Sequence, residues 1–397
     1  MWRTLLLSAS FLSAHGLTKH KLFDLMHVVI DTWSPERIMF GIQSLEMCNF
    51  HCLRSNNCTL FTFNASAKEC KINKFNGSLM ETIPSPESEL VHLIKSDAKE
   101  IIGVFGQNPN RSYEYDPYGS QDAPISYIPF EPQGHNSEAH MFNYNGGIMK
   151  CGGTPNWNTQ LRTCYFAYPG SWKWVEVAKM NKKCGRGGSG WLLGNPWIAG
   201  GSEGTSSHNK TIILKNGAWE FGPDLPIPGV HHSLVELSPS KVLVIGMSIF
   251  TGSNPMDSRS ETYLYDAITK EWSIFAHLSS HRPCMSVGKV ALNEVKSIVV
   301  GVGGGGKPGF PVTDEVNILD LHNRIWTKAP YPFPTPISYG KVIVIDQGKR
   351  LLHLGGSSLT GGPNPKVYEY VHNKPWKRLH DLPSKIVRFG VLSYKVY

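Results

Sequence analysis

The chain has 397 residues, a formal net charge of +8 at pH 7, 39 glycines and 27 prolines, and only 18% of its residues are charged. This length accommodates two domains or one large repeat array. The many turn-forming residues and the scarcity of helix-period stretches exclude a mainly helical protein and predict a mainly β one. After the N-terminus, no segment stays apolar for the roughly 20 residues that a transmembrane helix needs, so we expect no membrane span.

Residues 1–16, MWRTLLLSASFLSAHG, are typical of a secretory signal peptide. Arg3 precedes an apolar run from Leu5 to Leu12, and the small residues Ala14 and Gly16 follow it. This run is too short for an anchoring helix. We therefore expect cleavage near Gly16 and a secreted, extracellular protein. Export also makes nucleic acid an unsuitable partner.

A small segment after the signal holds half of the eight cysteines, namely Cys48, Cys52, Cys58 and Cys70. The three- and four-residue spacing around the first two predicts a helix, and a β-like run with a second strand follows. An even set of cysteines in a small exported segment predicts a disulfide framework. A zinc site is not expected, because no paired CxxC is present. Four cysteines allow three pairings.

The spacing C-x3-C-x5-C, followed by Phe61-x-Phe63 and a last cysteine, resembles the core pattern of the PAN/apple family. We assign residues 17–96 to this PAN/apple-like domain. The resemblance implies a small α+β fold in which Cys48 pairs with Cys70 and Cys52 with Cys58. It also implies a module that binds proteins or carbohydrates and has no catalytic role.

From residue 97 onward, an apolar strand that ends in glycines recurs, usually followed by a tyrosine-bearing or alternating strand and then by a strand with a tryptophan. The glycine-ended strands stand at residues 101–106, 147–153, 197–201, 242–246, 298–306 and 351–356. Their last glycines lie roughly 45–57 residues apart, which is the period of propeller blades. The glycine pair, the tyrosine and the tryptophan resemble the Kelch repeat of galactose-oxidase-type β-propellers.

Counting the repeats predicts six blades over residues 97–397. The first glycine-ended strand has no partner strand before it, and the last strand of the chain, residues 388–397, has no glycine pair after it. Pairing these two would close the ring without an exposed sheet edge. Five or seven blades are the alternatives, because the first two blades are irregular.

Binding residues of a propeller are expected on the loops that enter its innermost strands. His140, His231, His232, His281 and Arg282 stand at roughly equivalent entries and are our candidates for the mouth of the central channel. Such imidazoles can hold copper, as in galactose-oxidase-type enzymes. Those enzymes also need tyrosine ligands and a crosslinked cysteine, and we find no matching set. We therefore expect structural histidines, no bound metal, no cofactor and no catalytic residue.

A basic cluster at Lys179, Lys182, Lys183 and Arg186 is a candidate anion-binding site, with a solvated loop as the alternative. Cys151 and Cys164 lie on adjacent predicted strands and are expected to form a disulfide; a Cys164–Cys184 bridge is also feasible, and Cys284 has no obvious mate. Sequons for N-glycosylation stand at Asn57, Asn64, Asn76, Asn110 and Asn209.

These features predict a secreted, disulfide-bonded glycoprotein that recognises extracellular proteins or glycans and catalyses no reaction. The first alternative is a carbohydrate-active enzyme, of the copper-oxidase, epimerase or hydrolase type, that uses the channel mouth. The second alternative is a structural component of the extracellular matrix.

Overall fold

The computed structural model describes residues 99–106, 112–122, 124–129, 137–156, 158–250, 257–306, 309–358 and 362–396. Before them it describes the backbone of the strands β1 (Arg37–Phe40), β2 (Leu60–Asn64), β3 (Glu69–Asn73) and β4 (Glu89–Leu93). The chain divides into two compact units, one comprising Met1–Lys99 with Lys395–Tyr397 and the other Glu100–Tyr394.

The described strands of the N-terminal unit form a four-stranded sheet in the order β1-β3-β2-β4, and they pair antiparallel. The predicted β-like run after Cys58 is β2, and the predicted second strand, which contains Cys70, is β3. Asn64 ends β2. The expected signal peptide, the expected helix with Cys48 and Cys52, Cys58, and the sequons at Asn57, Asn76 and Asn110 lie outside the described residues.

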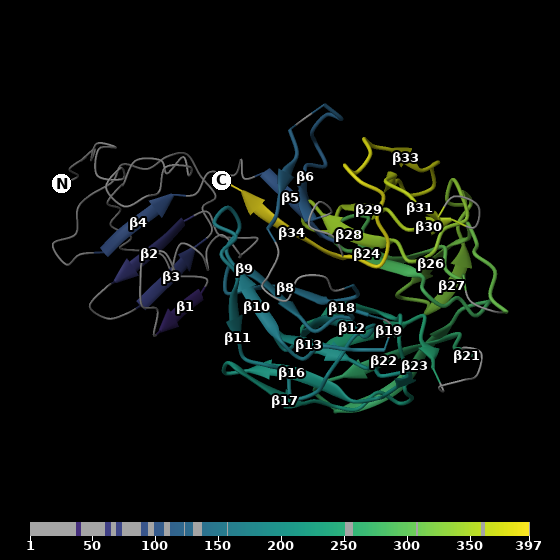
Figure 1. Cartoon of the computed structure of the whole chain (residues 1–397), viewed down its shortest axis with the longest axis horizontal. Coiled ribbons are helices and arrows are strands. Elements are labelled where there is room, and N and C mark those ends of the chain that lie inside the picture. Colours follow the sequence, from purple (N-terminus) through teal and green to yellow (C-terminus); the bar gives the residue numbers. More distant parts are fainter. Residues whose placement is uncertain are drawn as a thin grey trace. The chain divides into compact units, whose positions relative to one another are not determined.

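The described part of the second unit forms six four-stranded sheets, each of which is one blade of a propeller (Figure 1). From the innermost strand outward, the blades are as follows: blade 1, β34 (Gly390–Val396), β5 (Lys99–Phe105), β6 (Ser112–Tyr115) and β7 (Ser126–Tyr127); blade 2, β8 (His140–Tyr144), β9 (Gly147–Cys151), β10 (Cys164–Ala167) and β11 (Val175–Val177); blade 3, β12 (Gly188–Leu192), β13 (Asn195–Ala199), β16 (Thr211–Lys215) and β17 (Ala218–Phe221); blade 4, β18 (Ser233–Ser238), β19 (Lys241–Ile245), β22 (Glu261–Asp266) and β23 (Glu271–His277); blade 5, β24 (Ser286–Ala291), β25 (Ser297–Val302), β26 (Val316–Asp320) and β27 (Ile325–Lys328); blade 6, β28 (Lys341–Ile345), β29 (Arg350–Leu354), β32 (Val367–Tyr370) and β33 (Lys377–Arg378).

The last strand of the chain closes the propeller, because β34 is hydrogen-bonded to β5 and supplies the innermost strand of blade 1. The same strand also binds blade 2, where the Asn143 side chain donates a hydrogen bond of 2.7 Å to the carbonyl oxygen of Ser393. The prediction of six blades closed by the C-terminal strand is therefore confirmed.

The hydrophobic core consists of separate clusters, each packed between neighbouring blades. Trp197 of blade 3, for example, is fully buried, and its ring lies 6.0 Å from that of Tyr265 in blade 4. The glycine pairs permit this packing, because Gly200 and Gly201 adopt φ angles of +61° and +113° that side chains disfavour. A Cβ atom on Gly200 would also lie 2.6 Å from the carbonyl oxygen of Gly229.

Two sets of loops form one face of the propeller, which we call the loop face. The loops between the second and third strands extend in blades 3, 4 and 6 into the short hairpins β14–β15 (Ser202–Glu203, Ser206–Ser207), β20–β21 (Ser248–Ile249, Asp257–Ser258) and β30–β31 (Ser357–Ser358, Gly362–Pro363). The loops that lead from one blade to the next join them through the bridges Gly185↔Ser202, Val230↔Ser248 and Ser338↔Ser357. Candidate binding residues on either set therefore lie close together. Among the residues that the structure describes, no helix has the length and apolar character needed to cross a membrane.

Candidate functional site

Six residues with left-handed backbone conformation mark equivalent points of the six blades. Each lies two positions before the first residue of an innermost strand and has a φ angle between 54° and 64°. We call this set the axial ring: Glu138, Arg186, His231, Cys284, Tyr339 and Arg388. A left-handed conformation disfavours residues with side chains by about 1 kcal/mol or more. The turn from one blade into the next imposes this conformation, yet every ring position carries a side chain.

Backbone hydrogen bonds connect neighbouring members of the axial ring. The amide of Glu138 donates to the carbonyl oxygen of Arg388 at 3.0 Å, and the amide of His231 donates to that of Arg186 at 2.7 Å. The amides of Tyr339 and Arg388 donate to the preceding ring residue, each at 3.4 Å. The backbone thus fixes where each of these side chains begins.

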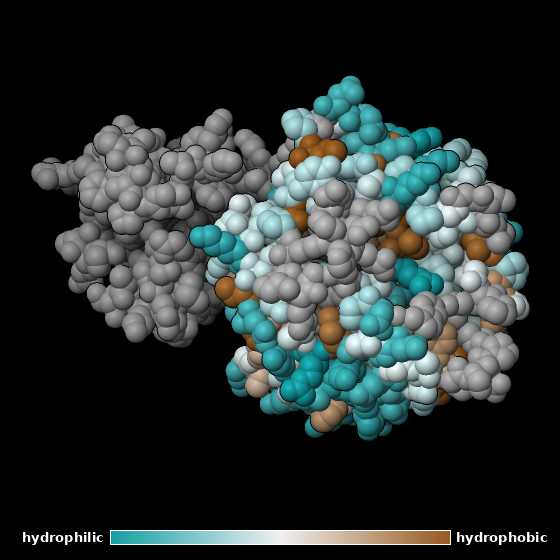
Figure 2. Space-filling model, in the orientation of Figure 1, coloured by the Kyte–Doolittle hydropathy of each residue, from teal (hydrophilic) through white to brown (hydrophobic). Residues whose placement is uncertain are grey.

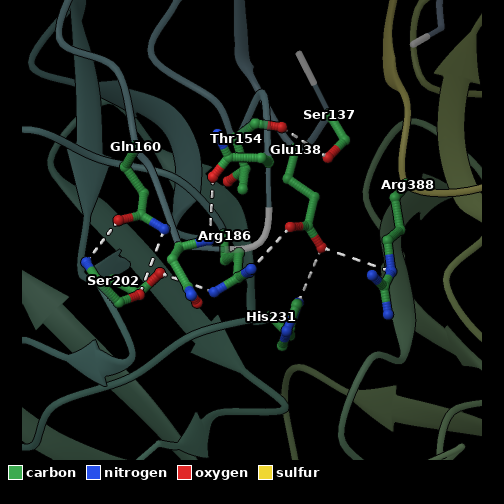
Figure 3. A network of polar contacts seen from close by, with 11 residues as sticks. Ser137, Glu138, Thr154, Gln160, Arg186, Ser202, His231 and Arg388 are labelled. Atoms are coloured by element: carbon green, nitrogen blue, oxygen red, sulfur yellow. Dashed lines mark hydrogen bonds and ion pairs between the residues drawn. The ribbon is translucent and has the colours of Figure 1, made fainter. Parts of the chain in front are cut away.

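The Glu138 carboxylate is the centre of a polar network formed by three other ring residues (Figure 3). Its Oε2 atom lies 3.1 Å from Nε of Arg186, and its Oε1 atom lies 3.5 Å from Nδ1 of His231 and 3.9 Å from Nε of Arg388. Arg186 also donates to the Ser202 hydroxyl at 3.3 Å. Glu138 precedes blade 2 and His231 precedes blade 4, so their contact joins two blades that are not neighbours in the ring.

Aromatic side chains adjoin this network on two sides. The ring centre of Tyr339 lies 4.3 Å from the Cζ atom of Arg388, and the same ring packs edge-on against His231. Phe250 also packs edge-on against His231, and the Arg186 guanidinium lies 5.7 Å from its ring centre. The backbone amide of Phe250 donates to the Ser207 hydroxyl, and its carbonyl oxygen accepts from the amide and hydroxyl of that residue. Charged groups and aromatic side chains therefore lie together around Glu138.

The charges of the axial ring do not balance. Two guanidinium groups, Arg186 and Arg388, surround the single carboxylate of Glu138. Lys341, the first residue of β28, adds a third cation that interacts with Glu138. Burial lowers the pKa of Lys341, and the charge of Glu138 acts in the opposite direction. The ring is thus electropositive.

The predicted channel-mouth histidines occupy different positions of the repeat, so they do not form one set. Only His231 belongs to the axial ring. His140 is the first residue of β8 and is buried, and burial lowers its pKa to about 3. His232 is also buried, and its Nε2 atom lies 3.1 Å from the amide of Gly188 and 2.9 Å from the carbonyl oxygen of Ala199. These two imidazoles pack inside the protein and do not line the mouth.

The two remaining predicted residues, His281 and Arg282, also differ in their positions. His281 is exposed, whereas Arg282 is buried. The Arg282 guanidinium donates to the carbonyl oxygen of Glu315 at 2.7 Å, and burial lowers its pKa to about 10. Arg282 therefore binds the residue that precedes β26 in its own blade.

The residues of the predicted anion-binding cluster have different partners and different burial. Lys179 pairs with Glu176 at 2.9 Å, and Lys182 pairs with Glu203 at 2.7 Å. Lys183 is exposed, whereas the side chain of Arg186 is only 2% exposed and belongs to the axial ring. Only the arginine of this cluster therefore reaches the network around Glu138.

The predicted covalent features within the described residues have clear positions. Cys151 and Cys164 form a disulfide between the paired strands β9 and β10. Cys184 and Cys284 are buried thiols. The Asn209 side-chain nitrogen donates to the carbonyl oxygen of Leu225 at 3.3 Å.

Most of the axial ring was missed by the search for candidate residues in the sequence. That search selected histidines by residue type, and the ring contains only one. The available signal was positional, since each ring residue precedes an innermost strand by the same two residues. Glu138, Tyr339 and Arg388 would have been found by aligning the blades on those strands.

The described residues show no group of three or more His, Cys, Asp or Glu side chains placed to hold a metal ion. The described surface in Figure 2 is mostly hydrophilic, with apolar residues at scattered places. The axial ring therefore remains the most concentrated group of converging charged side chains that we identify.

Comparison with known proteins agrees with this architecture. Residues 26–94 match the family model described as PAN domain, which confirms the domain predicted from the cysteine spacing. The solved structure titled "Structure of YjhT" is similar to this chain with a TM-score of 0.57 and 13% sequence identity, over 72% of this chain and 95% of that one. At this identity, the likeness shows the propeller fold alone. No curated protein matches the chain at a significant level.

Proposed function

Since the chain combines a PAN domain with a six-bladed β-propeller, we propose that it is a secreted recognition protein that binds acidic extracellular glycans or proteins and catalyses no reaction. The binding face would be the loop face of the propeller, centred on the axial ring. The signal-like residues 1–16 support an extracellular location.

The observation that carries this proposal is the electropositive ring beside aromatic rings. Arg388 is the ring cation with the larger accessible side chain, since it is 26% exposed whereas Arg186 is 2% exposed. A guanidinium binds carboxylate and sulfate groups through several donors at once. Tyr339 and Phe250 offer flat apolar faces next to it. An acidic ligand therefore finds charge and contact area at one place.

The non-catalytic part of the proposal rests on the state of Glu138. A general base must reach the proton that it removes. The Glu138 carboxylate is directed to Arg186 and His231 and its side chain is only 8% exposed. A carboxylate that is paired with a buried guanidinium and is itself largely covered is poorly placed to reach a substrate proton.

Binding to immobilised heparin and to a glycan and protein array tests the proposal. We expect the purified secreted protein to be retained by acidic ligands and to elute as the salt concentration rises. Arg388→Ala should weaken retention at least several-fold. Lys215→Ala, which removes an exposed cation at the end of β16, is the matched control. Equal weakening by both variants, or no acidic ligand at all, would contradict the proposed site.

A carbohydrate-active enzyme is the second candidate, because Glu138 and His231 are two acid–base groups only 3.5 Å apart. Incubation with reducing and oligomeric sugars, followed by NMR, would detect epimerisation or hydrolysis. Turnover that is lost in Glu138→Gln would favour this candidate over the recognition protein.

A further inference from the structure

We infer that Glu138 is an internal occupant of the anion site in the axial ring, so that an acidic ligand binds there only by displacing the Glu138 carboxylate. This inference rests on the proposed binding function of the ring. It adds an autoinhibitory contact that holds the ring closed when no ligand is present.

The contacts of Glu138 are those that a bound carboxylate would make. Its two oxygens face different partners: Arg186 lies at Oε2, whereas His231 and the cation Arg388 lie at Oε1. These partners come from blades 3, 4 and 1, whereas Glu138 comes from blade 2. The site is therefore built by several blades and filled by the side chain of another (Figure 3).

The cations need an anion between them whether or not Glu138 provides it. Arg186 has a side chain that is 2% exposed, and Lys341, which also interacts with Glu138, is partly buried. Buried cations without a counter-charge are strongly destabilising. Removal of Glu138 therefore leaves a site that favours any small anion able to reach it. Glu138 and a ligand carboxylate compete because the same guanidinium groups would bind either one.

The geometry also indicates how Glu138 can be displaced. Only its contact with Arg186, at 3.1 Å, has the length of a hydrogen bond, whereas the contacts with His231 and Arg388 are 3.5 and 3.9 Å. Arg388 is 26% exposed, so a ligand can first pair with its guanidinium. Rotation of the Glu138 side chain would then release Arg186 to the same ligand.

Melting of Glu138→Ala in acetate tests the inference directly, because acetate replaces the deleted carboxylate. We expect acetate to raise the melting temperature of this variant by several degrees relative to chloride at the same pH and ionic strength. The wild type should show no such difference, because its site is filled. The double variant Glu138→Ala/Arg186→Ala should lose the acetate effect.

Glu138→Gln is the second variant, for the case that Glu138→Ala folds poorly. Glutamine keeps the shape of the side chain and removes its charge. We expect this variant to bind heparin several-fold more tightly than the wild type, because a neutral amide competes less well for Arg186 and Arg388. Equal melting of Glu138→Ala in acetate and chloride would overturn the inference, as would unchanged or weaker heparin binding by Glu138→Gln.

The two measurements separate this inference from the proposed function. If the wild type binds no acidic ligand but acetate stabilises Glu138→Ala, the anion site exists and the recognition function fails. If the wild type binds acidic ligands through Arg388 but acetate has no effect on Glu138→Ala, the function stands and the internal occupant does not.

Discussion

The axial ring combines an unfavourable backbone conformation with side chains that glycine could not supply. Tyr339 illustrates this, since its φ angle is 55° and its ring contacts both Arg388 and His231. Left-handed positions in proteins usually carry glycine or asparagine. The axial ring carries tyrosine, histidine, cysteine and charged residues instead. We infer that the contacts of these side chains offset the backbone strain.

A pair of substitutions at Tyr339 measures that strain. Tyr339→Gly and Tyr339→Ala remove the same contacts, but only glycine adopts the left-handed conformation freely. We expect the free energy of unfolding of Tyr339→Gly to exceed that of Tyr339→Ala by about 1 kcal/mol in urea denaturation. The opposite order is expected at Ser273, an exposed position in the middle of β23, where glycine weakens a strand. A less stable Tyr339→Gly would mean that no strain is stored at the ring.

Buried histidines make the propeller sensitive to acid. Burial lowers the pKa of His353 to about 3 and that of His232 to about 4, well below the value near 6.5 of the unfolded chain. Between these values the unfolded chain binds more protons than the folded one. The stability from these groups is therefore complete above about pH 6.5 and is lost as the pH falls, by up to about 1.4 kcal/mol per pH unit for each histidine.

Thermal melting between pH 7 and pH 5 checks this pH dependence. We expect the melting temperature to fall over this interval, and to fall less in His353→Gln, which removes one buried titrating group. His322→Gln replaces an exposed histidine in a turn and should retain the wild-type pH dependence. If the melting temperatures of wild type and His353→Gln fell equally between pH 7 and pH 5, His353 would not be a source of the acid sensitivity.

At the scale of elements, two tryptophans of outer strands connect their blade to the one before it. The indole nitrogen of Trp219 in β17 donates to the carbonyl oxygen of Ala178 after β11, at 3.1 Å. Trp326 in β27 repeats this with the hydroxyl of Thr262 in β22, at 2.9 Å. Trp219 and Trp326 thus bury apolar area and also form a directional bond between blades, whereas the buried indole nitrogen of Trp272 in β23 has no such partner among the described residues.

Thr262→Val tests the directional part of this contact. Valine keeps the volume of threonine and removes the acceptor, which leaves the buried indole N–H of Trp326 without its bond. We expect a loss of about 1–3 kcal/mol in the free energy of unfolding. Thr327→Val, on the exposed side of β27, should change stability by less than about 0.5 kcal/mol. Equal effects of the two variants would show that the indole bond contributes little.

The blades could be predicted from the sequence because their markers have strict physical roles. Glycine pairs such as Gly200-Gly201 adopt conformations closed to other residues, and tryptophans such as Trp326 fill the space between sheets. The same residue types therefore appear in successive repeats and can be recognised in the sequence. The axial ring cannot be recognised in this way, because its six residues share a backbone conformation while their side chains differ in charge and size. Arg186 was selected as part of a basic cluster, and the carboxylate that it binds, Glu138, carried no local signal.

At the scale of the whole molecule, closure depends on one strand from the far end of the chain. β34 supplies the inner strand of blade 1, and its Leu392 is buried in the cluster shared with blade 2. Arg388, which precedes this strand, is a member of the axial ring. Closure of the propeller and completion of the ring are therefore the same event, so the complete ring forms only in the closed propeller.

Deletion of residues 388–397 tests this coupling. We expect the truncated chain to lose the cooperative melting transition of the whole propeller, because blade 1 would expose an unpaired edge and the apolar surface beneath Leu392. Addition of the peptide RFGVLSYKVY should restore part of the transition and of heparin retention, whereas the same peptide with Leu392→Asp should restore neither. Normal melting of the truncated chain, or loss of only a small fraction of the circular dichroism signal, would show that the blades are stable without closure.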